Sequence, residues 1–111
     1  MRTVVRLTQA RFVRRGGGSA QISGSYRWFT NAPELVHTVT VTRNGQRVSR
    51  RSSRIEHSPG RRMAGEVFQF ATSLSDNKPP FGRVRSGVWR VRVSISGAGR
   101  TDAASQRYVV G

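Results

Sequence analysis

The 111-residue sequence contains no cysteine, five acidic side chains and a single lysine, Lys78. Without cysteine, the chain forms no disulfide and offers no thiolate to a metal ion. No apolar run approaches the ~20 residues that a membrane-spanning helix needs. Residues 1–13 alternate arginine with apolar side chains, unlike the continuous apolar segment of a signal peptide. We therefore expect a protein made in the cytoplasm, with no membrane partner.

Positive charge is what the sequence has in excess. Lysine and arginine together number 20, and the formal net charge is +15. A charge of this size attracts nucleic acid, anionic membranes and acidic protein surfaces. Nearly all of it is carried by arginine, whose planar guanidinium binds carboxylate or phosphate groups through two hydrogen bonds. A GC-rich genome also favours arginine, so a surface of mostly solvated arginines remains an open interpretation.

Several segments alternate apolar and polar side chains, which is typical of half-buried β-strands. They are residues 5–12, 20–28, 34–50, 66–74, 87–97 and 104–110. Within the third segment, Asn44-Gly45 is a strong signal for a β-hairpin, and residues 97–99 (Gly-Ala-Gly) predict a second turn. A change of phase between Leu7 and Ala10 predicts a bulge or a strand that changes sheets. The predicted core consists of Ile22, Tyr26, Trp28, Val39, Val41, Phe68, Phe70, Trp89, Val91, Val93 and Ile95.

The pattern as a whole predicts an all-β fold. About seven short strands are separated by turn signals, and no window shows sustained helical periodicity. This organisation indicates one antiparallel β-sandwich, a single domain over residues 1–111. Residues 50–65 hold five arginines without clear alternation, and we expect a loop or a short crossover there. The glycines at 16–18 are interpreted as a hairpin turn.

Residues with catalytic potential are few. His37 lies on the apolar-facing side of its segment, which favours a buried histidine over a general base. Glu56 and His57 adjoin several arginines and favour a local salt bridge. The histidines and acids show no metal-ligand spacing, and no helix follows residues 16–18 as a phosphate-binding loop would require. The sequence therefore predicts no enzyme activity, no cofactor and no metal site.

Three segments resemble bacterial immunoglobulin-like and fibronectin type III-like domains. They are AQISGSYRW, HTVTVTRNGQRV and SGVWRVRVSISGAGRTDAASQRYVV, and the resemblance as a whole covers residues 19–110. The resemblance implies an immunoglobulin-like sandwich, although the cysteine pair of antibody-type domains is missing. Free-standing domains of this kind without an export signal resemble phage virion proteins, such as capsid decoration or tail proteins. The resemblance thus implies a non-enzymatic structural role in a virion, for a protein made in the host cytoplasm.

The candidate binding residues are arginines concentrated in two parts of the sequence. They are Arg50, Arg51, Arg54, Arg61, Arg62, Arg83, Arg85, Arg90 and Arg92. We expect these side chains to contact carboxylates or carbonyls of neighbouring capsid or tail subunits, because guanidinium groups bind carboxylates bidentately. Association between copies of the chain also remains open.

Nucleic-acid binding through phosphate contacts is the alternative function. Proteins that bind single strands usually combine basic grooves with exposed aromatic side chains on which the bases stack. In this sequence most aromatic residues share the apolar phase of their strands, and Phe29 and Phe81 are the two that do not. The arginines are also spread along the chain. The sequence therefore favours a protein partner and leaves nucleic acid as the second interpretation.

Overall fold

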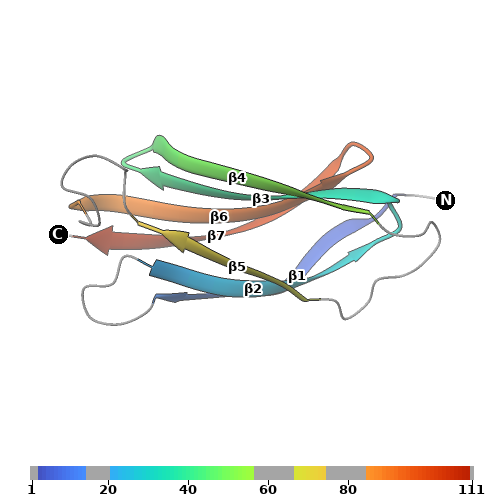
Figure 1. Ribbon diagram of the computed structural model, residues 1–111, viewed down its shortest axis with the longest axis horizontal. Coiled ribbons are helices and arrows are strands. Elements are labelled where there is room, and N and C mark those ends of the chain that lie inside the picture. Colours follow the sequence, from blue (N-terminus) through green and yellow to red (C-terminus); the bar gives the residue numbers. More distant parts are fainter. Residues whose placement is uncertain (1–2, 15–20, 57–66, 75–84, 111) are drawn as a thin grey trace.

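The computed structural model describes residues 3–14, 21–56, 67–74 and 85–110 (Figure 1). No helix in this described part is long and apolar enough to cross a membrane. Its strands are β1 (Val5–Arg14), β2 (Gln21–Thr30), β3 (Glu34–Arg43), β4 (Gln46–Glu56), β5 (Val67–Ser73), β6 (Gly87–Gly97) and β7 (Arg100–Val110).

The strands form two antiparallel sheets packed face to face, as Figure 1 shows. One sheet has the order β1-β2-β5 and the other β4-β3-β6-β7. The predicted all-β sandwich of about seven antiparallel strands is therefore confirmed. The resemblance to immunoglobulin-like domains stays a prediction.

The core lies between the sheets and consists of the side chains that alternation places on the inner faces. Trp89, Val91, Val93 and Ile95 of β6 have no exposed surface. Ile22, Tyr26, Trp28, Val41 and Phe70 are buried with them.

Two members of the predicted core differ in their outcome. Val39 is half-buried and packs against the core cluster. Phe68 lies in β5, but its side chain is outside the described part of the structure. The other predicted core residues are buried, so period-two alternation correctly predicted the inner faces of β2, β3 and β6.

Strand β4 corrects one prediction. It continues to Glu56 and pairs with β3 along its length, for example Arg50 with Thr40 and Arg54 with Val36. Residues 50–56 are therefore not a loop. The pattern was missed because β4 is a sheet edge, where arginine and serine are tolerated on both faces and no large apolar side chains need to alternate. The remainder of that segment, residues 57–65, and the glycines at 16–18 lie outside the described residues.

Turns and bulges set the register of the strands. Asn44 and Gly45 have φ values of 50° and 82°, and Ala98 and Gly99 have 48° and 79°. Positive φ at both central residues is what a two-residue type I′ hairpin requires, so both predicted turns are confirmed. The predicted irregularity in β1 is confirmed as a register shift between Thr8 and Arg11.

A second register shift bends β4 next to its turn. Val41 pairs with Ser49 and Thr42 with Arg47, so Val48 is an extra residue on the β4 side. Val48 packs against the core cluster. This bulge decides which arginines of β4 face outward.

Candidate functional site

The outer face of the four-stranded sheet collects arginines from three strands. The register places Arg90 of β6 beside Thr42 and Arg92 beside Thr40. Paired residues of neighbouring strands point to the same face of a sheet. Arginines of β4 and β7 that pair with Thr40, Thr42 or Arg90 therefore lie on this face too. The resulting arginine patch consists of Arg47, Arg50, Arg90, Arg92 and Arg107.

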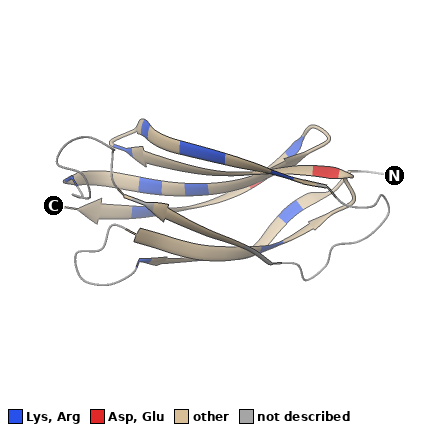
Figure 2. Ribbon diagram, viewed as in Figure 1, with Lys and Arg blue, Asp and Glu red and all other residues tan. Residues whose placement is uncertain are grey.

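The arginine patch occupies two adjacent rows of cross-strand pairs. All five side chains are exposed. Neighbouring strands lie about 4.8 Å apart and successive rows about 7 Å apart, so the five guanidinium groups share one compact area. Figure 2 shows the blue segments of β6 with blue segments of β4 and β7 in the half of the sheet toward the C terminus.

The other half of this face is different. Its rows carry small or hydroxyl side chains, with a hydrogen bond between Thr38 Oγ1 and Ser52 Oγ of 3.1 Å. Arg54 lies in this half and forms an ion pair with Glu34, with Nε 3.0 Å from Oε1. The basic charge is therefore concentrated at one end of the sheet.

Carboxylates of the described residues lie elsewhere. Glu34 forms an ion pair with Arg54, and the backbone of Glu56 pairs with that of Glu34 at the far end of the sheet. Asp102 accepts hydrogen bonds from the backbone N–H groups of Leu7, at 2.8 Å, and of Ala103, at 2.9 Å. The described part of the chain thus places no acidic residue in either row of the arginine patch.

One pair within the arginine patch is electrostatically unfavourable. Arg90 and Arg107 are directly opposite each other on β6 and β7. Like charges directly opposite each other destabilise a sheet. Favourable cross-strand pairs contribute roughly 0.2–1 kcal/mol each, which sets the order of magnitude of this effect. The isolated fold gains nothing from this arrangement, whereas an anion bound between the two side chains would be held by both.

An exposed valine pair borders the arginine patch. Val88 and Val109 pair across β6 and β7, one row beyond Arg90 and Arg107. Their side chains are 42% and 67% exposed. The row is fixed to the β3–β4 hairpin, since the Val88 N–H donates to Asn44 Oδ1 at 2.9 Å. Apolar surface beside arginine is typical of protein–protein interfaces, in which arginine is enriched.

The nine predicted arginines fall into separate groups. Arg50, Arg90 and Arg92 lie in the arginine patch, while Arg54 is in the other half of the same face. Arg51 pairs with the inward-facing Val39, so it leaves β4 on the side opposite to Arg50.

The remaining predicted residues are not brought into the arginine patch. Arg85 precedes β6, is half-buried, and accepts a hydrogen bond at its carbonyl oxygen from Trp89 Nε1 at 2.9 Å. Arg61, Arg62 and Arg83 lie outside the described residues. Arg47 and Arg107 were missed by the sequence analysis and complete the arginine patch.

A buried polar pair lies in the core, away from this surface. His37 is 1% exposed, as predicted for a core histidine, and its Nδ1 is hydrogen-bonded to the hydroxyl of Tyr26. The two rings stack with centroids 5.6 Å apart, and Trp28 meets His37 edge-on at 5.7 Å. Burial lowers the pKa of His37 to about 4 and raises the pKa of Tyr26. His37 is therefore neutral at physiological pH, and the Tyr26 hydroxyl keeps its proton.

No protein-family model, curated protein or solved structure matched this chain. The functional argument therefore depends on the chemistry of the surface.

Proposed function

We propose that the protein is a non-enzymatic docking module, a structural component of a large assembly. The arginine patch binds an acidic surface on a neighbouring protein subunit. One observation carries the proposal: five exposed arginines gather in two rows, with no described carboxylate among them and an exposed valine pair at their border.

The valine pair favours a protein partner over nucleic acid. Burying apolar surface contributes roughly 25 cal/mol per Å², and a protein surface offers apolar groups next to carboxylates. A phosphate backbone offers charge alone. The arginine patch also contains no aromatic residue on which a base could stack. Protein carboxylates and apolar side chains together match both parts of this surface.

A phage capsid or tail is the assembly that we favour. The support comes from the resemblance of residues 19–110 to immunoglobulin-like domains, a kind of domain that phage virion proteins also contain. Subunits of such particles present the same surface many times, so a docking module with one compact binding area would occupy equivalent sites throughout the particle. Arginine suits this task because its fork fixes orientation as well as contributing charge.

The test is sedimentation of the protein from cells that naturally produce it. Lysates are separated on density gradients with and without nuclease, and the amount of protein per particle is measured. Three forms are compared: the unmodified chain, Arg90→Ser with Arg92→Ser, and the charge-matched control Arg54→Ser with Arg100→Ser. Near-ultraviolet circular dichroism of the buried tryptophans verifies that each form is folded.

We expect the unmodified chain and the control to sediment with a particle at fixed stoichiometry, unaffected by nuclease. Truncating one partner of a desolvated charge pair typically costs about 2–5 kcal/mol, or at least roughly 30-fold in affinity, so the patch variant should remain at the top of the gradient. Release by nuclease would instead support nucleic-acid binding. A folded patch variant that occupies the particle at the unmodified level would refute the proposal.

A further inference from the structure

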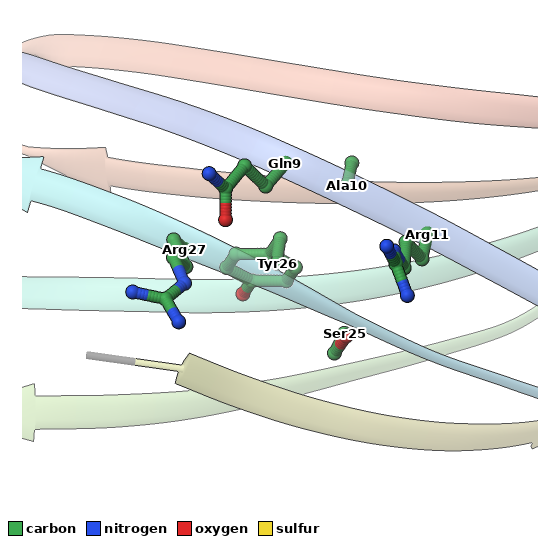
Figure 3. Close-up of a pocket in the computed structure, with 6 residues that line it drawn as sticks. All are labelled: Gln9, Ala10, Arg11, Ser25, Tyr26 and Arg27. Atoms are coloured by element: carbon green, nitrogen blue, oxygen red, sulfur yellow. The ribbon is translucent and has the colours of Figure 1, made fainter. Parts of the chain in front are cut away.

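The outer face of the three-stranded sheet carries a pocket that the arginine patch does not involve. It opens at the irregular part of β1, which runs alongside β2 in the same sheet (Figure 3). The residues lining it are Gln9, Ala10, Arg11, Ser25, Tyr26 and Arg27.

A bulge in β1 creates this pocket. The pairing of β1 with β2 is in register up to Thr8, which lies opposite Arg27, and resumes at Arg11, opposite Ser25. Gln9 and Ala10 therefore oppose a single residue of β2, Tyr26. Gln9 has a φ of 50°, a left-handed conformation that favours glycine. Bulges of this kind redirect side chains and are over-represented beside functional sites.

Gly24 holds the bulge against the core. A Cβ atom at this position would overlap the carbonyl oxygen of Arg11 and the ring of Phe70. The close approach of the two strands and the aromatic ring thus requires glycine. Arg11, whose carbonyl oxygen lies at this close contact, also lines the pocket.

The polar groups around the pocket can all donate hydrogen bonds. Arg11 and Arg27 are diagonal neighbours across the strand pair, a relation that places Cα atoms about 7–8 Å apart. Figure 3 shows their side chains on opposite sides of the Tyr26 ring. The Gln9 carboxamide and the Ser25 hydroxyl supply further donors, and no carboxylate is among the residues lining the pocket.

The pocket also has a buried aromatic residue beneath it. Tyr26 is 1% exposed, and its hydroxyl is hydrogen-bonded to His37 in the core. Protein below the pocket excludes water from one side of a bound ion. Because the effective dielectric constant is lower next to protein than in bulk water, attraction to the two guanidinium groups is stronger there than on an open surface.

We propose that this pocket binds an oxyanion, a carboxylate or a phosphate group. The guanidinium groups of Arg11 and Arg27 hold it from both sides, and the N–H of the Gln9 carboxamide and the O–H of Ser25 donate to its oxygens. Planar guanidinium groups match two oxygens of either anion. The site is on the sheet opposite the arginine patch and does not depend on the proposed docking function.

The experiment is a titration of the full chain at constant ionic strength, monitored by two-dimensional ¹H–¹⁵N NMR. Succinate, inorganic phosphate and chloride are added in separate series. Arg11→Gln and Arg27→Gln remove one donor group each. Arg6→Gln is the matched control, because Arg6 is an exposed arginine of the same strand that does not line the pocket.

We expect saturable shifts of the Gln9 and Ala10 amide signals with succinate, with phosphate or with both, and the preference identifies the anion. Either pocket variant should weaken binding at least tenfold, and Arg6→Gln should leave it unchanged. Arg11 adjoins the bulge, so Arg11→Gln could disturb the pocket itself. Arg27 lies in a regular part of β2, and Arg27→Gln therefore still tests the proposal in that case. Shifts that chloride reproduces, or equal weakening in Arg6→Gln, would show general charge screening and overturn the proposal.

Discussion

The buried histidine makes the fold sensitive to acid. His37 is 1% exposed, and burial lowers its pKa from 6.5 to about 4. In the unfolded chain the same histidine is solvated and titrates near its ordinary pKa of about 6.5. Between these two values the unfolded state binds a proton that the folded state does not. Stability must therefore fall as the pH is lowered through this window.

The pKa values set the size of the effect. A His37 pKa lowered from 6.5 to about 4 is worth up to about 3 kcal/mol when the titration is complete. At about pH 4.5 most of this loss has occurred, so the free energy of unfolding should be about 2 kcal/mol smaller than at about pH 7. Below pH 4 the folded protein also takes up the proton, and this contribution then stops changing.

Urea unfolding monitored by tryptophan fluorescence measures the effect at intervals between about pH 7 and pH 4. Carboxylates also titrate at the acidic end, so the comparison is made with His37→Gln, which keeps a hydrogen-bonding partner for the Tyr26 hydroxyl and does not titrate. Subtracting the two curves cancels the contributions of groups that the substitution does not affect. Parallel curves for the two proteins would refute the assigned burial and protonation of His37.

Three further predictions concern stability. Arg107→Thr should raise the free energy of unfolding by a few tenths of a kcal/mol at low salt, since it removes the repulsion with Arg90; the gain should vanish in concentrated salt, and a salt-independent gain would point to another cause. Gly24→Ala should cost at least about 2 kcal/mol in thermal or urea unfolding, because the added methyl group overlaps its neighbours in a packed core; a neutral result would contradict the close packing. Asn44→Ala should cost about 1–2 kcal/mol, since it removes the acceptor of the Val88 N–H and places alanine at positive φ; hydrogen exchange should show the loss at the Val88 amide, and continued protection there would contradict this role.

Alternation predicted the strands that bury one face. In β6 each second residue is a large apolar side chain, because the inner face must pack against the three-stranded sheet while the outer face meets water. Strand β4 carries no such signal after Val48. It lies at a sheet edge, and its backbone pairing with β3 places few demands on its side chains. The sequence therefore predicted the sandwich but ended this strand too early.

The part of the arginine patch on β6 and β7 was readable from the sequence. The two-residue turn at Ala98-Gly99 pairs Gly97 with Arg100, and counting back along both strands from that pair brings Arg90 opposite Arg107. The turn and the residue count therefore predict that Arg107 lies beside Arg90. The alignment of β6 beside β3 was not readable, because it joins strands far apart in the chain and depends on the packing of the whole sheet.

The contribution of β4 was hidden for a different reason. Counting from the Asn44-Gly45 turn without an irregularity would pair Arg50 with Val39 and direct it inward. The extra residue, Val48, shifts the register so that Arg50 pairs with Thr40 while Arg47 pairs with Thr42. Both arginines then face outward although they are three residues apart. A bulge that depends on local packing has no period in the sequence, so alternation alone assigns Arg50 to the wrong face.

The Arg90–Arg107 pair separates docking from the two simpler explanations of an arginine-rich surface. If arginines were present for stability, each would have a carboxylate partner, as Arg54 has in Glu34. If they were merely solvated, removing Arg107 would relieve its repulsion with Arg90 but would not weaken binding to a particle. A partner that neutralises the arginine patch stabilises the folded state by binding it selectively, and it relieves a repulsion that the free protein carries. Arg107→Thr should then make the free protein more stable and the complex weaker, and an ion-paired or a solvated arginine would not produce that combination of opposite effects.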